Sequence, residues 1–239
     1  MQRNHIRDNY HRVLERIANA AKLAGRNPDE IRLVVVTKTH PTDIIKAVID
    51  VGATDLGENY VEEAVPKIQS LSKNEGIKWH MVGHVQSRKA SLVCEYFHYL
   101  HSLDSGKLAD RLSRLAVELG KSLPVWLEFN VGGELSKSGW NLSREEDWGI
   151  ILPDIERILD LPGLNLLGMM AIPPYNQDPE ASRPYYRRLR KFQQYVIDHF
   201  HLTGFNELSM GMSGDFEIAI QEGSSCLRIG QAILGPRNG

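Results

Sequence analysis

Cysteine is scarce in this sequence, and long apolar runs are missing from it. The two cysteines, Cys94 and Cys226, lie far apart in apolar stretches, which excludes a disulfide-based scaffold and predicts two buried free thiols. No apolar run approaches the ~20 residues that a membrane-spanning helix needs, and the polar N-terminal stretch shows no signal-peptide pattern. We therefore expect a cytoplasmic protein that is not embedded in a membrane.

An excess of either charge is missing as well. The chain carries 28 basic and 30 acidic residues, which gives a net charge of −2. Proteins that bind nucleic acid or an anionic membrane surface usually show a basic excess, so we expect neither partner. Hydrophobic residues make up 42% of the 239 residues, which is enough for a buried core and argues against disorder.

A regular alternation of strand-like and helical segments runs along the chain. Residues 3–24 carry apolar side chains at helical spacing, and Gly25 and Pro28 end this helix. The run IRLVVVTK (31–38) is typical of a parallel strand that is buried on both faces. Seven further strand-like runs, separated by helical patterns, follow at 53–59, 78–83, 96–104, 124–131, 164–172, 206–212 and 226–230.

This alternation predicts the fold. Strands that alternate with helices form parallel sheets through right-handed crossovers, and eight such units close a (β/α)₈ barrel. We therefore predict an α/β protein in which residues 1–239 form a single TIM barrel with an extra N-terminal helix. An open doubly wound sheet is the alternative, but no G-x-G-x-x-G motif follows the first strand, which counts against its dinucleotide-binding form.

The first predicted strand ends in a lysine. Barrel active sites lie at the carboxyl ends of the strands, and alternation puts Lys38 on the same face as Val34 and Val36. If these two valines face the interior, Lys38 faces the barrel mouth. An isolated strand-end lysine commonly extends to water, but a partly desolvated pocket disfavours the ammonium and leaves a nucleophilic amine that can condense with an aldehyde.

The ends of the last two predicted strands offer a place for an anion. Ser213 is the expected N-cap of a helix after the seventh strand, and the amides of Ser213 and Gly214 would be unpaired there. A helix N-terminus at this position of a barrel is a phosphate site. Arg228 and Gly230, at the end of the eighth strand, add fixed charge and close backbone approach. A plain helix cap is the alternative for Ser213.

Two acidic residues, Asp215 and Glu217, follow in the first turn of that expected helix. They oppose a bound anion unless their side chains point away from it. With an anion on one side of the mouth and the Lys38 amine on the other, the arrangement suits an aldehyde-bearing phosphate ester.

Two polar segments at other strand ends leave alternatives open. Glu58 or Asn59, at the end of the second strand, could order the polar edge of a ligand, or a strand-terminal asparagine could bond its own turn. The loop after the fifth strand carries Glu134 and Lys137, and it either borders the mouth or forms a solvated surface turn.

His80 and His84 are spaced four residues apart, which suggests a zinc pair. No third ligand is spaced nearby, however, and zinc sites use three or four protein ligands. We therefore expect no metal, and one histidine at the mouth or in the core instead.

Many motifs in order carry a family resemblance, namely VVVTK, GENYVEE, WHMVGHVQSRK, HSLD, FNVGGELSKSGW, GMMAIPP, LSMGMSGDFEIAI and LRIGQAILG. From about residue 3 to Arg237 the chain closely resembles the pyridoxal phosphate homeostasis proteins, a PLP-binding family. These are similar in fold to the barrel domain of alanine racemases, the fold type III proteins. The resemblance implies that the cofactor is pyridoxal 5′-phosphate (PLP) and that Lys38 is the lysine that forms a Schiff base with it.

The same resemblance implies roles for other residues. Ser213 and nearby backbone amides, including that of Gly230, would hold the phosphate, and Arg228 would face the pyridine nitrogen. A guanidinium keeps its proton, so that nitrogen would stay unprotonated and would be a poorer electron sink. The resemblance further implies that Asn59, Met212 and Gly214 complete the cofactor site.

One departure from the racemases bears on activity. Those enzymes continue into a β-rich domain, dimerise and supply a catalytic tyrosine across the interface, whereas this sequence ends soon after its eighth unit. Racemisation uses two bases, and only Lys38 is visible here. We therefore expect a monomer that buffers or delivers PLP with little or no turnover, and apo-forms of PLP enzymes are candidate recipients.

Two alternatives remain open. One is a PLP-dependent amino-acid enzyme, such as a weak racemase. The other is a barrel enzyme whose lysine forms a Schiff base with a sugar phosphate without any cofactor.

Overall fold

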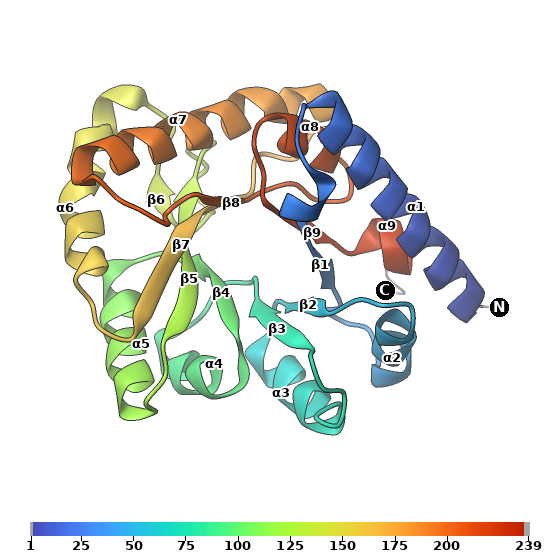
Figure 1. Ribbon diagram of the computed structural model, residues 1–239. Coiled ribbons are helices and arrows are strands. Elements are labelled where there is room, and N and C mark those ends of the chain that lie inside the picture. The colour runs from blue at the N-terminus through green and yellow to red at the C-terminus, as the bar shows by residue number, and fades with distance from the viewer. Residues whose placement is uncertain (1, 237–239) are drawn as a thin grey trace.

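Parallel strands curve round a common axis, with helices outside them, in the computed structural model, which describes residues 2–236 (Figure 1). Within this part of the chain, eight strands form a ring in the order β4–β3–β2–β1–β9–β8–β7–β5, and pairing of β4 with β5 closes it. The predicted TIM barrel is confirmed, and the open sheet is excluded. The strands are β1 (Arg32–Val36), β2 (Asp55–Glu58), β3 (Lys78–Met81), β4 (Tyr99–Leu103), β5 (Leu123–Asn130), β7 (Leu164–Ala171), β8 (Glu207–Ser209) and β9 (Cys226–Ile229).

One short strand lies outside the ring. β6 (Trp140–Asn141) pairs in parallel with the end of β5, where Trp140 is the partner of Phe129 and Asn141 is the partner of Asn130. The sequence analysis placed only a loop after the fifth predicted strand and missed this strand. Two residues are too few to show the alternation of apolar and polar side chains that reveals a strand.

Helices cover the outside of the barrel between successive strands (Figure 1). The α-helices are α1 (Gln2–Leu23), α2 (Thr42–Asp50), α3 (Val61–Ser70), α4 (Ala90–Tyr96), α5 (Gly106–Glu118), α6 (Trp148–Leu159), α7 (Arg183–Phe200), α8 (Phe216–Gln221) and α9 (Gln231–Leu234). The 3₁₀-helices are η1 (Pro28–Glu30), η2 (Ser87–Lys89), η3 (Glu145–Asp147) and η4 (Pro179–Ser182). No helix within residues 2–236 is both long enough and apolar enough to cross a bilayer.

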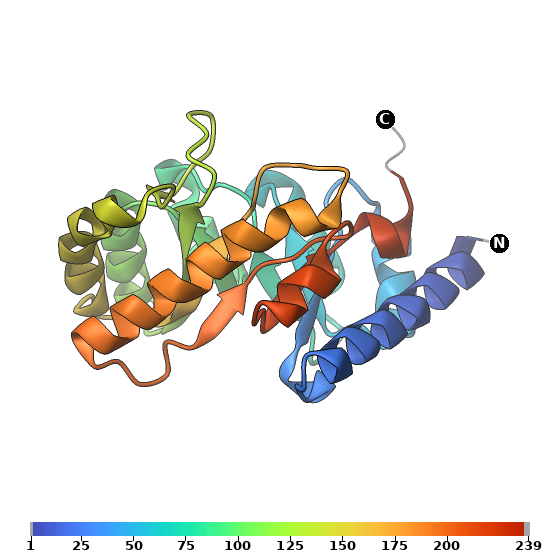
Figure 2. The same ribbon diagram turned by 90° about the horizontal axis from the view of Figure 1, so that it is seen from above.

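The extra N-terminal helix is confirmed, and it braces the last part of the barrel. α1 lies against α8 and α9, and α8 lies between α1 and α7 (Figure 2). The buried face of α1 repeats every three or four residues, at Ile6, Tyr10, Val13, Ile17 and Ala21. Asn9 Nδ2 donates to Ile233 O at 3.1 Å, and Arg16 Nε donates to Glu217 Oε1 at 2.6 Å. α1 therefore holds both helices that flank the predicted phosphate loops.

The two cysteines are buried free thiols, as the sequence predicted. Burial raises the pKa of Cys94 to about 11 and that of Cys226 to about 12. Both side chains therefore stay protonated near neutral pH, and thiols in that form are poor nucleophiles.

Candidate functional site

The predicted site residues come from four strands that are neighbours in the barrel, in the order β2–β1–β9–β8. All lie at or near the carboxyl ends of these strands, and β2, β1 and β9 can be followed side by side in Figure 1. The set consists of Asn59 after β2, Lys38 after β1, Arg228 and Gly230 on and after β9, and Met212, Ser213 and Gly214 after β8.

Lys38 lies in a turn directly beyond β1, and its side chain is half-buried. Strand pairing continues one residue past β1, where Thr37 N donates to Gly57 O at 2.8 Å. Val34 and Val36 face the barrel interior beside Gly57, where an added Cβ atom would lie 2.9 Å from Val34 Cγ1. Alternation continued past the strand would direct Lys38 to the same interior side.

A buried charged group holds the backbone on both sides of Lys38. We call Lys67, Glu58 and Glu63 the Lys67 cluster. Lys67 Nζ donates to Glu58 Oε1 at 3.0 Å, to Glu63 Oε1 at 2.5 Å and to the carbonyl oxygen of Thr37 at 3.2 Å. Glu63 Oε1 also accepts from the backbone N–H of Thr39 at 2.6 Å. Thr39 has a φ of 65°, a strained value for a β-branched residue, and this hydrogen bond helps to hold it.

The Lys67 cluster corrects the prediction for Glu58. Its side chain is fully buried and points to α3, away from the mouth, because Gly57 next to it takes the interior side. Glu58 Oε1 accepts from Thr37 Oγ1 at 2.6 Å. Burial raises the pKa of Glu58, against the opposing effects of Thr37 and Lys67. Glu58 therefore supports the turn that carries Lys38 and does not face a ligand.

Asn59 lies directly after β2. Its Oδ1 atom is buried and accepts no hydrogen bond from the described residues. Its backbone contacts Gly83 so closely that an added Cβ atom there would lie 2.3 Å from Asn59 O. Buried polar atoms in proteins are nearly always bonded, so this unpaired acceptor marks a position where a ligand group would complete the site.

The prediction that a helix begins at Ser213 is wrong. Residues 213–215 form a turn, and α8 begins at Phe216. Asp215 organises this turn, because its Oδ1 accepts from Met212 N at 2.8 Å. Ser213 Oγ instead accepts from the backbone N–H of Ala232 at 3.1 Å, so it caps α9 and not the helix that follows it in sequence. Capping partners that are distant in sequence cannot be recognised from the local pattern.

The N-terminus of α9 therefore takes the place expected for that of α8. Gly230 is the N-cap residue of α9, and its backbone lies against β1, with an added Cβ atom 3.0 Å from Val36 O. Gly214 is exposed and has no heavy atom near its Cβ direction. The two glycines thus leave backbone amides of the 213–214 turn and of α9 open to an anion.

Both acidic residues beyond Ser213 have partners within the protein. Asp215 Oδ2 accepts from Ser182 Oγ at 2.9 Å and from the Tyr186 hydroxyl at 2.7 Å. Glu217 is bonded to Arg16 of α1. Glu217 and one oxygen of Asp215 are thus directed to side chains outside the 213–215 turn.

Arg228 lies in the barrel interior and is 5% exposed. Its Nη1 donates to Ser209 Oγ at 2.5 Å, and its Nη2 donates to Ala171 O at 3.1 Å. Burial lowers the pKa of Arg228, but a guanidinium keeps its proton at any pH at which proteins fold. A permanent positive charge therefore lies beside β1, where Arg228 is paired with Val34.

The sequence analysis missed Glu128 on β5. Burial, with the charge of Asp104 adding to it, raises the pKa of Glu128 to about 7, while Arg228 and His84 oppose the shift. Glu128 Oε2 is buried and has no hydrogen-bond partner among the described residues. The signal was available, since an acidic residue two positions after the buried Trp126 shares its interior face.

The two histidines lie in different surroundings. His80 is fully buried and bonded within the core, whereas His84 is largely exposed and its Nδ1 lies 2.8 Å from Asp104 Oδ2 and 3.3 Å from Ser138 Oγ. No group of three or more His, Cys, Asp or Glu side chains that could hold a metal occurs in the described part of the chain.

The loop after β5 is anchored to the barrel. Asn130 Nδ2 donates to Glu134 O at 2.8 Å, and Lys137 forms an ion pair with Glu134. Lys137 Nζ also donates to the carbonyl oxygens of Ile172 and Pro173 just after β7. Its ammonium therefore holds two loops together at the carboxyl ends of β5 and β7.

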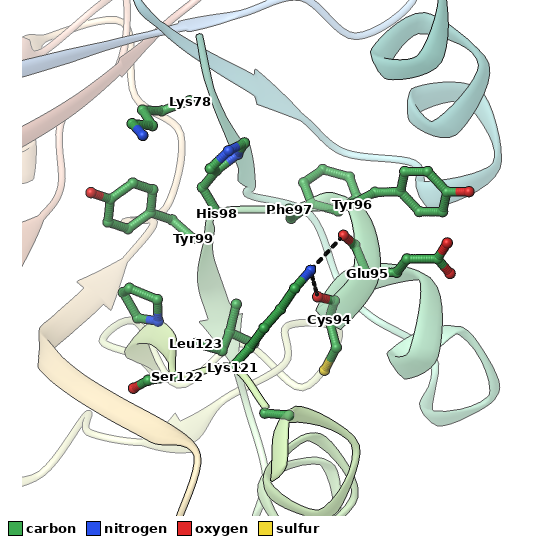
Figure 3. A pocket seen from close by; sticks show the side chains of 12 residues that line it. Lys78, Cys94, Glu95, Tyr96, Phe97, His98, Tyr99, Lys121, Ser122 and Leu123 are labelled. Carbon is green, nitrogen blue, oxygen red and sulfur yellow. Dashed lines mark hydrogen bonds between the residues drawn. The ribbon is translucent and has the colours of Figure 1, made fainter. Parts of the chain in front are cut away.

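A cavity of about 450 Å³ lies at the opposite end of the barrel. It is lined by residues at the start of strands, such as Lys78 and Leu123, and by the end of α4 (Figure 3). Lys121 Nζ donates there to the carbonyl oxygens of Cys94 and Glu95, at 3.2 and 3.0 Å. This lysine caps the C-terminus of α4, and the cavity is separate from the residues around Lys38.

Comparison with known proteins agrees with this architecture. The family described as "Alanine racemase, N-terminal domain" matches residues 5–238. A pyridoxal phosphate homeostasis protein of Aquifex aeolicus (strain VF5) is 37% identical over 226 residues, which is 95% of this chain and 96% of that protein. This chain belongs to the pyridoxal phosphate homeostasis protein family.

Two solved structures complete the comparison. PipY of Synechococcus elongatus PCC7942, with PLP bound, is 31% identical with a TM-score of 0.80, and the match covers 92% of this chain and 100% of PipY. Alanine racemase of Clostridium difficile 630 is 15% identical with a TM-score of 0.70, over 99% of this chain and 58% of the racemase. At that identity the likeness to the racemase shows a shared fold alone.

Proposed function

We propose that this protein binds PLP as a Schiff base between its aldehyde and Lys38 Nζ, and that it buffers or delivers the cofactor with little or no turnover. The observation that carries this proposal is the convergence of Lys38, Ser213 and Arg228 on three neighbouring strand ends in a member of a family that includes PLP homeostasis proteins. A small anionic aldehyde fits this set, because it needs an amine, an anion site and a polar contact for its ring.

The amine end is supported by the Lys67 cluster. Lys67 and Glu63 bond the backbone at Thr37 and Thr39, so the residue between them is held in place before any ligand arrives. Fixed placement of a nucleophile lowers the entropic cost of forming a covalent bond.

The phosphate end is supported by two backbone segments. Ser213 Oγ accepts from Ala232 N, so its O–H can donate to an anion. The amides of the 213–214 turn and of Gly230 add neutral donors at the start of α9. Met212 is half-buried directly before this turn, where it can cover the side of a bound ring.

The ring end is supported by Arg228 and Asn59. Arg228 would hold the pyridine nitrogen unprotonated, because a guanidinium donates and does not give up its proton. Asn59 Oδ1, which is unpaired among the described residues, would accept a hydrogen bond from the polar edge of the ring. Bound PLP supplies an electron sink, and contact with Arg228 makes that sink a poor one.

The decisive experiment is spectroscopic. Purified protein supplied with PLP should be yellow, and reduction with borohydride should leave a pyridoxyl group on the peptide that contains Lys38, located by mass. Lys38→Ala should lose the colour and the adduct, whereas Lys46→Ala, at an exposed position of α2, should keep both. Wild-type protein that stays colourless with added PLP would overturn the proposal and favour a sugar-phosphate Schiff base.

One observation favours PLP-dependent turnover as a second candidate. Glu128, with a pKa of about 7, could act as an acid or base near neutral pH. Incubation with L- and D-amino acids in heavy water separates the two functions. Fast α-deuterium incorporation that is lost in Glu128→Gln would establish turnover, and its absence in the wild-type protein would support a carrier.

A further inference from the structure

A line of polar side chains, four of them buried, runs through the barrel interior from Arg228 on β9 to Asp55 at the start of β2. Arg228 Nη1 bonds Ser209 Oγ at 2.5 Å, and Ser209 Oγ lies 2.7 Å from His101 Nδ1. His101 Nε2 lies 2.9 Å from His80 Nδ1, and His80 Nε2 lies 2.9 Å from Asp55 Oδ1. We call these five residues the interior relay. They come from β9, β8, β4, β3 and β2, and no local sequence pattern connects them.

Elementary hydrogen-bond chemistry gives the relay one direction. A guanidinium can only donate, so Ser209 Oγ accepts from Arg228 and its own O–H donates to His101 Nδ1. His101 must then carry its proton on Nε2 and donate to His80 Nδ1. His80, in turn, donates from Nε2 to the carboxylate of Asp55. Every polar atom in the line is satisfied only in this arrangement, so both histidines are neutral and share the Nε2–H tautomer.

The surroundings keep both rings uncharged. Burial is the main cause that lowers the pKa of His101, and His80, Arg228 and Arg32 add to it. Burial also lowers the pKa of His80, with Arg32 and His98 adding and Asp55 opposing.

Aromatic rings fix the planes of both imidazoles. His101 stacks on Trp126 with ring centroids 4.0 Å apart, and His80 stacks on Tyr99 at 4.4 Å. The relay is therefore rigid in orientation as well as in protonation.

We propose that His101, His80 and Ser209 are positioning residues that hold the Arg228 guanidinium in place without neutralising it. A carboxylate in direct contact with Arg228 would cancel much of its charge. The relay instead presents a neutral hydroxyl and leaves its one anion, Asp55, three side chains away at the start of β2. This inference rests on the proposed role of Arg228 toward the pyridine nitrogen and adds the residues that make that role possible.

The first test needs no cofactor. Long-range ¹H–¹⁵N spectra of the apoprotein with labelled histidine should show two rings as the Nε2–H tautomer, unchanged between about pH 6 and pH 8, where exposed histidines titrate. The guanidinium signals of Arg228 should be in slow exchange. An Nδ1–H tautomer or an imidazolium at either buried ring would overturn the relay, whatever the protein binds.

The second test compares variants at the Arg228 end. Ser209→Ala removes one oxygen with little change of volume, so it should fold, while the Arg228 signals should broaden and PLP affinity should fall about tenfold, the usual effect of one lost hydrogen bond to a charged group. His101→Leu should lower PLP affinity in the same way. His101→Asn keeps an acceptor near the Nδ1 position, so its loss of affinity should be smaller than that of His101→Leu. The absorbance of the bound cofactor should shift in Ser209→Ala and His101→Leu.

These outcomes separate the two proposals. Wild-type protein that fails to bind PLP defeats the proposed function, while the tautomer spectra still decide the relay. If the wild type binds PLP and Ser209→Ala shows the same affinity, absorbance and Arg228 signals, the positioning role alone is defeated. His98→Leu alters a histidine outside the relay and should leave the cofactor absorbance unchanged.

Discussion

The interior relay and the barrel mouth differ in whether their polar atoms have hydrogen-bond partners. In the relay, both ring nitrogens of His80 and of His101 and the hydroxyl of Ser209 have partners. At the mouth, Asn59 Oδ1 and Glu128 Oε2 are buried without partners among the described residues. Satisfied networks stabilise and define a structure, whereas unpaired atoms cost stability. The relay is therefore a paired network, whereas the unpaired atoms at the mouth are open to a ligand group.

The largest expected effect on stability is at the Lys67 cluster. Lys67→Met should lower the free energy of unfolding by about 3–5 kcal/mol, because it leaves the buried charge of Glu58 unpaired. Chemical denaturation measures the loss, and Lys46→Met, at an exposed site, is the control. A loss as small as that of the control would mean that the cluster does not stabilise the turn around Lys38.

Glu128 should give the mouth a signature in the pH dependence of stability. Its pKa of about 7 is above the ordinary value of 4.5, so between these values the folded protein binds more protons than the unfolded chain. The contribution of Glu128 to stability is then complete below about pH 4.5 and is lost as the pH rises through about 7, with a span of up to about 3 kcal/mol.

Unfolding free energies measured across that pH range for the wild type and for Glu128→Gln would check this. The difference between the two curves should shrink or reverse with rising pH, because only the wild type has a buried carboxyl group at this position whose ionisation destabilises the folded state. Parallel curves would show that Glu128 titrates normally.

The smallest expected effect on stability is at Asn59. Asn59→Ala removes an acceptor that no described residue uses, so the free energy of unfolding should change by no more than about 0.5 kcal/mol. PLP affinity should fall several-fold, which fluorescence titration can measure. A large loss of stability with unchanged affinity would place Asn59 with the satisfied interior and not with the mouth.

Membership of the homeostasis family agrees with the chemistry of the mouth. An arginine facing the pyridine nitrogen would weaken the electron sink that most PLP enzymes use. A protein that holds PLP reversibly has no need of that sink. The proposed carrier function and the observed restraint on Arg228 thus depend on the same guanidinium.

Most of the fold could be predicted from local patterns, because strand-like runs alternate with helical segments along the chain. The errors lie where local signals are weak or ambiguous. β6 is two residues long. The serine at 213 carries the signal of a helix cap but caps α9 instead of α8. Glu58 looked like a mouth residue because the sequence does not show that Gly57 takes the interior side.

The sequence by itself determined the alternation of strands and helices, the placement of Lys38, Asn59, Ser213 and Arg228 at strand ends, and the family. These features depend on residue type and spacing over short distances. Only the tertiary structure decided which groups bond across the barrel. His101 and Ser209 are 108 residues apart, and closing the ring of strands brings them together. Hydrogen bonds between distant strands depend on register and curvature, which no local window of sequence contains.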